Sequence, residues 1–339
     1  MPRLRRADCS APGLRRVRRG RGFSYREEDG SLVADAETLE RIAELAIPPA
    51  WQDVWICPFA NGHIQATGID AAGRKQYLYH QAWRESRDRR KFEEMLDFAR
   101  ALPRLRKRVI EDLGIRGFPR ERVLAGAVRL LDLGFFRVGS DQYTAENETY
   151  GLSTLRRRHV HFERGAAIFD YKAKGAKRHV QELADPDVVK LLRGLDRRKG
   201  GGHELLAFRN GEAWVDVKAS DINTYLKESA GGDFSAKDFR TWNATVLAAV
   251  GLAVRSAEDP PKTKAARKRI ANAVVKDVAR YLSNTPAVCR ASYIDPRVFD
   301  KFDSGNLLRT SLRRVIADTG PDEFADREKI ERAVMRLLD

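Results

Sequence analysis

The chain of 339 residues is 42% hydrophobic and 33% charged, a composition typical of a folded protein with room for two domains. No apolar run approaches the roughly 18–20 residues of a membrane span, and the three cysteines are isolated, which excludes a disulfide framework or a CxxC zinc site. We therefore expect a cytoplasmic protein. Lys and Arg outnumber Asp and Glu by 63 to 48, and the net charge of +15 favours a polyanionic partner. Nucleic acid is favoured over an anionic membrane because no basic amphipathic helix with a wide apolar face is evident.

The N-terminal segment is strongly basic. Residues 1–21 carry eight arginines against one acid, with Gly and Pro interspersed. This pattern predicts a disordered basic arm over residues 1–24. A solubilising tail and an arm that follows DNA are equally compatible with it.

Residues 25–90 have the pattern of a small β-rich domain. The runs at 53–58, 63–68 and 75–80 are β-prone and are separated by the turn sequences FANG and IDAAGR. An Asp-capped helix is expected at 35–46.

From about residue 81 the apolar residues take a helical period, and we place the domain boundary near residue 90. We expect two helices first, separated at Pro103. Further helices are expected at 121–134 and 263–282, where apolar residues recur along one helix face. A β element interrupts the helices, with short strands at 160–162, 168–172 and 179–183. We therefore predict an α+β protein in which residues 91–339 form a larger, mainly α-helical domain containing a three-stranded β element.

Several common catalytic motifs are absent from the sequence. No GxxxxGK[ST] phosphate loop and no HExxH motif occur, and no compact Asp/Glu cluster suggests a two-metal nuclease. The histidines show no ligand spacing beyond His159 and His161, a pair that is better explained as structural. We therefore expect any chemistry on DNA to need neither ATP nor a metal ion.

Chemistry on a phosphodiester without metal needs a nucleophile, cationic or amide donors for the non-bridging oxygens, and an acid for the leaving oxygen. Tyr293 lies between a helix end and Pro296 in the stretch SNTPAVCRASYIDP (283–296), with Asn284 nine residues before it. It is either a half-buried aromatic or a nucleophile. A free phenol has a pKa of about 10, so it attacks phosphorus poorly unless nearby cations stabilise its charge.

Three cationic residues are candidates to supply that field. Arg137 follows an apolar helix end in FFRVGSDQYTAENETYGLSTL (135–155), and Arg240 lies in the second turn of a helix beside Phe239 and Trp242. Lys174 lies at a Lys-rich hairpin tip, YKAKGAKRH (171–179), from which a flexible stem can deliver a proton. Taken alone, Arg137 is better explained as a surface or structural arginine and Arg240 as a solvated one, and only their occurrence together with Lys174 and Tyr293 indicates a site.

Taken together and in this order, these motifs resemble a type IB DNA topoisomerase of the small poxvirus-like bacterial class, a relative of the tyrosine recombinases. The resemblance covers residues 25–320. The stretch IPPAWQDVWICPFANGHIQATGIDAAGRKQYLYH (47–80) is similar to the N-terminal domain of that family. The catalytic part is carried by FRVGSDQYTAENETYGLSTL, KAKGAKRH, KDFRTW and NTPAVCRASYIDP.

The resemblance implies a role for each candidate. Tyr293 would attack the scissile phosphate and form a 3′-phosphotyrosine, Arg137 and Arg240 would hold the phosphate, and Lys174 would protonate the departing 5′ oxygen. Asn284 stands where many relatives have histidine, which favours a hydrogen-bond donor over a proton carrier. The resemblance further implies relaxation of supercoils of both signs without ATP, metal or other cofactor.

The resemblance also implies how duplex DNA is bound. The two domains would form a clamp around it, with Gln76, Tyr77 and Tyr79 of RKQYLYH touching bases in the major groove and Tyr143 contacting the backbone. Tyr77 and Tyr79 are alternatively one face of an ordinary strand. We expect a monomer, because the catalytic set is complete within one chain. As a protein that acts on DNA, it is expected to associate with the nucleoid.

Two alternatives remain open at this point. A tyrosine-type site-specific recombinase would share the Arg, Lys, Arg and Tyr chemistry, but recombinases usually carry His-x-x-Arg where KDFR has Lys237. A non-enzymatic architectural DNA-binding protein would explain the net charge, but not the ordered set of five residues. A Tyr293→Phe variant separates an enzyme from a binding protein.

Overall fold

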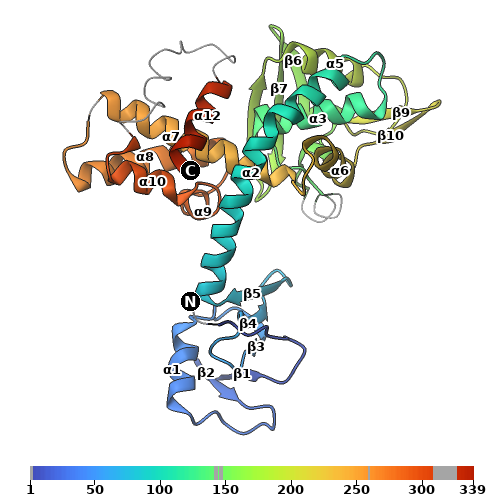
Figure 1. Ribbon diagram of the computed structural model, residues 1–339. Helices are drawn as coiled ribbons and strands as arrows, with labels where there is room; N and C mark the ends of the chain where they lie inside the picture. The colour runs from blue at the N-terminus through green and yellow to red at the C-terminus, as the bar shows by residue number, and fades with distance from the viewer. Residues whose placement is uncertain (1–2, 141–143, 145–147, 259, 308–326) are drawn as a thin grey trace. The chain divides into compact units, whose positions relative to one another are not determined.

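The computed structural model describes residues 3–140, 144, 148–258, 260–307 and 327–339 (Figure 1). The chain divides into two compact units, Met1–Lys91 and Phe92–Asp339. No helix in the described part of the chain is long and apolar enough to cross a membrane.

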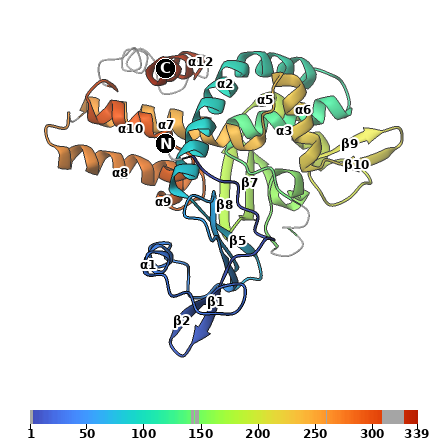
Figure 2. The same ribbon diagram turned by 60° about the horizontal axis from the view of Figure 1, so that its bottom comes forward.

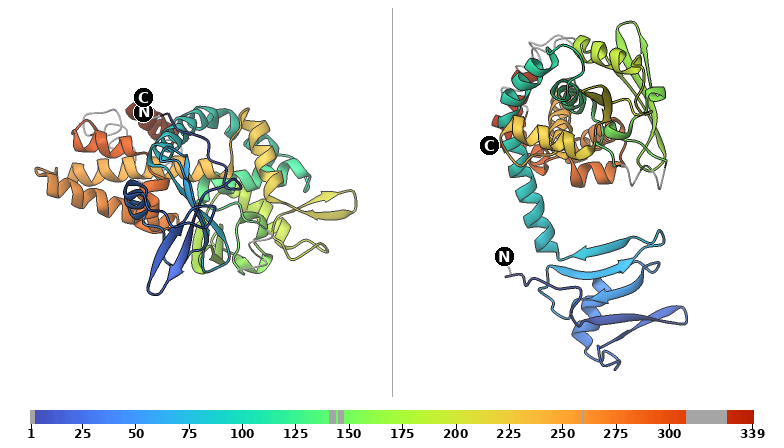
Figure 3. Two further views of the ribbon diagram at one scale, coloured as in Figure 1. Left: turned by 90° about the horizontal axis from the view of Figure 1, so that it is seen from below. Right: turned by 90° about the vertical axis from the view of Figure 1, so that its right-hand side faces the viewer.

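The first unit is a five-stranded antiparallel sheet with the order β2-β1-β3-β4-β5 and one helix against it (Figure 3, right). The helix, α1 (Ala36–Glu44), begins where the Asp35 carboxylate accepts a hydrogen bond from the Thr38 amide at 2.9 Å. Its buried Ile42 packs with apolar residues of the sheet such as Leu14 and Ile56. The strands are β1 (Leu14–Arg19), β2 (Gly22–Arg26), β3 (Gln52–Ile56), β4 (Ile64–Ile69) and β5 (Lys75–Tyr79).

The predicted helix and the three predicted strands of this unit are confirmed. The prediction of a disordered arm over residues 1–24 is wrong for residues 14–24, which belong to a β-hairpin. Residues 14–19 and 22–26 form a hairpin, because Leu14 and Tyr25 supply apolar side chains to the core. The Arg16 guanidinium donates to three carbonyl oxygens, those of Ile47, Pro48 and Trp51, at 2.7–3.2 Å. The prediction of a disordered arm rested on the number of arginines and did not consider how buried and exposed residues alternate along β1.

The second unit is mainly helical, as predicted, and the chain as a whole is α+β. The first helix, α2 (Gln81–Leu113), begins in the first unit and runs without a break through Pro103, where we expected two helices. Leu102 and Leu105 on either side of the proline are buried in the same core, which favours one continuous helix.

Within the described residues, the other α-helices are α3 (Arg120–Gly134), α5 (Pro186–Asp196), α6 (Ala219–Ala230), α7 (Ala236–Glu258), α8 (Lys264–Tyr281), α9 (Pro286–Ser292), α10 (Pro296–Asp303) and α12 (Arg327–Leu338). Helices α7, α8, α10 and α12 pack together (Figure 2).

The predicted three-stranded β element is present in the second unit. It consists of β6 (Val160–Glu163), β7 (Ala166–Ala173) and β8 (Lys177–Leu183) in the order β6-β7-β8. A separate hairpin is formed by β9 (Ala207–Asn210) and β10 (Ala213–Asp216). The turn between β7 and β8, residues 174–176, is exposed.

A buried ionic cluster holds α12 against the other helices of the second unit. Arg106 of α2 donates to both the Asp132 carboxylate of α3 and the Glu331 carboxylate of α12, at 2.7–3.0 Å. Arg327 of α12 donates to Asp132 and to the side-chain oxygen of Asn243 in α7, at 2.8 and 3.1 Å. The cluster therefore ties α12 to the three helices α2, α3 and α7.

Candidate active site

Arg137 is presented by the end of α3. The helix stops because Phe135 adopts a left-handed conformation (φ 53°), and the next residue, Phe136, is buried against Phe169 with ring centroids 4.9 Å apart. This anchor leaves Arg137 half-buried, and its Nη2 donates to Asn284 Oδ1 at 2.7 Å.

Arg240 is a buried cation in the second turn of α7, with 4% of its surface exposed. Its two terminal nitrogens donate to the carbonyls of Phe135 and Leu282, residues at the ends of α3 and α8. Burial lowers the pKa of the guanidinium to about 10, and the charge of Arg137 acts in the same direction. No carboxylate neutralises Arg240 among the described residues, which makes it a ready partner for an anion.

Asn284 follows the end of α8. Ser283 turns the chain with a left-handed φ of 52°, and Thr285 then caps α9 by accepting a hydrogen bond from the Val288 amide at 3.3 Å. The side-chain nitrogen of Asn284 is buried and makes no hydrogen bond of ordinary length to a described residue, but it lies close enough to the Tyr293 phenol to lower the pKa of that group. Because Arg137 holds the oxygen of this amide, the nitrogen is left as a donor.

Tyr293 lies at the C-terminal end of α9, half-buried, with the Arg240 guanidinium carbon 5.2 Å from the centre of its ring. Burial raises the pKa of the phenol, but the positive charges of Arg240 and Arg137 outweigh this and hold the pKa below its ordinary value. The two arginines, the amide and the phenol, which come from distant parts of the sequence, thus lie together in the structure.

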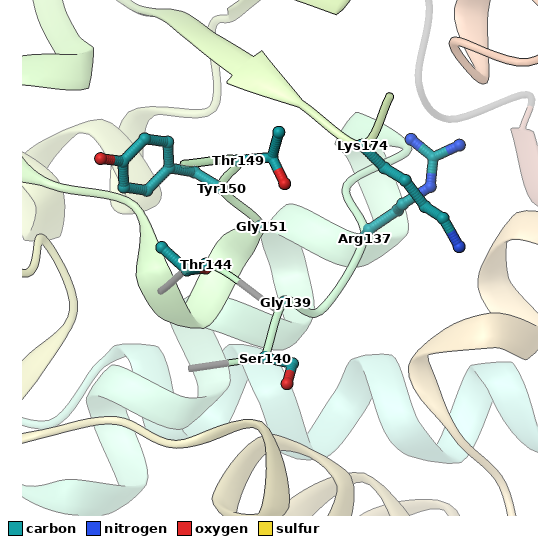
Figure 4. A pocket seen from close by; sticks show the side chains of 8 residues that line it. All are labelled: Arg137, Gly139, Ser140, Thr144, Thr149, Tyr150, Gly151 and Lys174. Carbon is teal, nitrogen blue, oxygen red and sulfur yellow. The ribbon is translucent and has the colours of Figure 1, made fainter. Parts of the chain in front are cut away.

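Lys174 is the first residue of the turn between β7 and β8, and its side chain is exposed. It lines a pocket of about 240 Å³ together with Arg137 and residues of the chain after it. Figure 4 shows the side chains of Lys174 and Arg137 beside each other at one side of this pocket. The other residues that line it are Gly139, Ser140, Thr144, Thr149, Tyr150 and Gly151.

The structure shows two positioning contacts that the sequence did not indicate. Thr245 of α7 is fully buried; its hydroxyl donates to the Tyr293 carbonyl at 3.2 Å and accepts from the Asp295 amide at 3.1 Å. His179 of β8 lies 2.8 Å from the Ser283 hydroxyl through Nδ1, and burial lowers its pKa. No short motif links these residues, since each pair is separated by 48 positions or more.

The candidate DNA-contact residues of the first unit do not share one face. Tyr77 and Tyr79 point from the same exposed face of β5, with parallel rings 6.0 Å apart. Gln76 alternates to the opposite face and donates to Asp70 at 2.8 Å. Tyr143 lies outside the described residues.

The geometry joins two fixed cations to a phenol of lowered pKa, which suits an enzyme that acts on phosphate esters. The family model described as the catalytic core of eukaryotic DNA topoisomerase I matches residues 80–308, and the N-terminal domain of bacterial DNA topoisomerase IB matches residues 22–70. The chain belongs to the type IB DNA topoisomerases.

Viral relatives agree with this family. The chain is 32% identical to the DNA topoisomerase 1B of Acanthamoeba polyphaga mimivirus over 83% of its length and 85% of the relative. It is 23% identical to a DNA topoisomerase 1 of rabbit fibroma virus over 90% of its length and 95% of the relative. The DNA topoisomerase 1B of vaccinia virus (strain Copenhagen) is 22% identical, with 76% of each chain covered. The prediction of a type IB DNA topoisomerase is therefore confirmed, and its substrate class is DNA.

Proposed function

We propose that this enzyme relaxes positively and negatively supercoiled duplex DNA, without ATP or metal, by cutting one strand through Tyr293 and resealing it after rotation. The Tyr293 oxygen attacks the scissile phosphorus, a P–O bond to tyrosine forms, and the P–O5′ bond breaks. The products are a 3′-phosphotyrosine and a free 5′-hydroxyl. The ester keeps the bond energy of the phosphodiester, so the reverse attack by the 5′-hydroxyl needs no nucleotide.

The observation that carries this proposal is the position of Tyr293 beside Arg240 and close to Arg137 and Asn284, where the two positive charges lower the pKa of its phenol. Neither arginine forms an ion pair with a carboxylate in the described part of the chain. A phosphate that approaches the phenol would meet Arg137 and Arg240, whose charge stabilises the additional negative charge of the transition state. The two guanidiniums supply the positive charge for which other phosphoryl-transfer sites use a metal ion.

Asn284 and Lys174 complete the proposed set. The side-chain nitrogen of Asn284, whose amide oxygen is held by Arg137, donates to a non-bridging oxygen, a role that does not change with pH near neutrality because an amide does not titrate there. Lys174, on its hairpin tip beside Arg137, gives its proton to the 5′ oxygen as that oxygen leaves. Every member of the set comes from the second unit, so we propose that a monomer is active.

The first unit would contribute contacts to duplex DNA. Tyr77 and Tyr79, exposed and stacked on one strand face, are suited to apolar contacts with base methyl groups. Gln76 would have to leave Asp70 to reach a base from the opposite face. Tyr143 is proposed as a backbone contact on the family resemblance alone.

A plasmid-relaxation assay tests the function. Negatively and positively supercoiled plasmids are incubated in EDTA without ATP with the wild type, Tyr293→Phe, or the control Tyr281→Phe, which changes an exposed tyrosine at the end of α8. We expect the wild type and the control to relax both plasmids, and Tyr293→Phe to bind DNA without relaxing either. Tight binding without relaxation by the wild type would contradict the proposal and favour an architectural DNA-binding protein.

A further inference from the structure

The hairpin β1–β2 carries an arginine face, which we define as Arg15, Arg19 and Arg26. All three side chains are exposed, and none forms an ion pair with another residue in the described part of the chain. Strand β1 lies outside the matched N-terminal-domain model, which begins at residue 22. The arginine face therefore belongs partly to a segment whose role the family match does not address.

The strand register places this face on the same side of the sheet as the exposed tyrosines. Arg26 pairs with Arg15, and Arg15 pairs with Trp55 of β3. The row continues from Trp55 to Thr67 of β4, and from Thr67 to Tyr77 of β5. Directly paired residues project to one face of a sheet, so Arg15, Arg26 and Tyr77 point to the same side.

The arginine face differs from the neighbouring Arg16 on the same strand. Arg16 points to the opposite face, where three backbone carbonyls satisfy its guanidinium and its charge stacks on Phe23. Arg15 and Arg26 lie directly opposite each other, and like charges in this arrangement are destabilising. A bound anion would remove this repulsion.

We propose that the arginine face binds the sugar–phosphate backbone of duplex DNA beside the groove that Tyr77 and Tyr79 enter. Arg15 and Tyr77 lie three strands apart in the sheet, counted through β3, β4 and β5. At the usual spacing between neighbouring strands, this separates their backbones by about 14 Å. This is close to the width of the major groove, about 12 Å, so tyrosines inside the groove bring the arginines to the adjacent phosphates. The inference rests on the proposed function for the tyrosine contacts, but not on the cleavage chemistry.

Salt-dependent binding of a fluorescent duplex tests this inference. The full-length chain carries Tyr293→Phe to prevent cleavage, and the variants Arg15→Gln and Arg15→Gln/Arg26→Gln are compared with it. Each lost phosphate contact should reduce the slope of log K against log salt by about 0.9, and so by about 1.8 for the double variant. The matched control is Arg18→Gln, which removes the same charge from an exposed position on the opposite face of β1.

We expect the slope to fall for the Arg15 and Arg15/Arg26 variants and to stay unchanged for Arg18→Gln, with no variant melting at a lower temperature than the parent chain. An unchanged slope in the double variant, or an equal fall for Arg18→Gln, would overturn the inference. Binding of the arginine face to anionic phosphatidylserine vesicles, with unaltered DNA binding, would also overturn it. The proposed function is tested separately by plasmid relaxation at low salt with Arg15→Gln/Arg26→Gln in a chain that keeps Tyr293. Relaxation by this variant supports the proposed function whether or not the arginine face binds DNA.

Discussion

The hydroxyl of Thr245 holds the backbone on both sides of the proposed nucleophile, and its removal has a calculable cost. It donates to the carbonyl of Tyr293 and accepts from the amide of Asp295, and both Thr245 and Asp295 are fully buried. Thr245→Val keeps the shape of the side chain but leaves both backbone groups without this partner. We predict that the variant is less stable and cleaves DNA more slowly, because the segment that carries Tyr293 is no longer fixed.

The magnitude follows from the two lost hydrogen bonds. A buried backbone group without a partner costs about 1–3 kcal/mol, so the loss of both partners should lower the free energy of unfolding by about 2–6 kcal/mol. In a unit of this size each kcal/mol lowers the melting temperature by about 2–4 °C. The control Thr245→Ser keeps the hydroxyl and removes one methyl group, which costs about 1 kcal/mol.

Two measurements check this prediction. Thermal unfolding gives the stability of both variants, and single-turnover cleavage of a duplex that cannot be resealed gives the rate of attack by Tyr293. We expect Thr245→Val to slow cleavage at least about tenfold with unchanged DNA affinity, and Thr245→Ser to stay close to the wild type. If Thr245→Val unfolds within about 0.5 kcal/mol of the wild type, or if Thr245→Ser is equally impaired, the hydroxyl does not position the nucleophile.

Three further predictions concern charge. Arg106→Met should lower the free energy of unfolding in denaturant by about 3–5 kcal/mol, because it leaves the buried Glu331 carboxylate without its main partner; a loss below 1 kcal/mol would contradict this. Burial and, to a smaller extent, two neighbouring arginines lower the pKa of His159 from 6.5 to about 4 in the folded protein. The unfolded chain therefore binds a proton at a higher pH than the folded protein does, and the free energy of unfolding should fall as the pH drops from about 6.5 to about 4. His159→Gln should flatten that part of a melting-temperature profile. Arg240→Met should raise the pKa of Tyr293 in an ultraviolet difference titration against Tyr293→Phe, and a lowered pKa would refute the electrostatic argument.

The parts of the fold that sequence predicted are those with a local signal. The Asp35 cap and the alternation along 75–79 are visible in a few neighbouring residues, and both elements are present. The hairpin at 14–26 was missed because the density of arginines hid the apolar Leu14 and Tyr25 that anchor it. The helix through Pro103 was missed because burial on both sides outweighs the local preference for a break.

The candidate site divides in the same way. The chemistry of phosphate esters made Tyr293 and the two arginines candidates, and the family resemblance assigned a role to each. The spacing of residues in the sequence could not show that Arg137 contacts Asn284 across 147 positions. Thr245 was invisible because a threonine in an apolar helix has no distinguishing pattern. Contacts between distant segments depend on packing, which the sequence does not display locally.

The identity of the nucleophile is the central claim, and trapping the covalent complex tests it most directly. A duplex with a nick that releases the 5′-hydroxyl strand is incubated with the enzyme in EDTA, and the protein–DNA adduct is digested and analysed by mass spectrometry. We expect a 3′-phosphotyrosyl peptide at Tyr293 and no adduct with Tyr293→Phe. An adduct at another residue, or on the 5′ end of the broken strand, would contradict it.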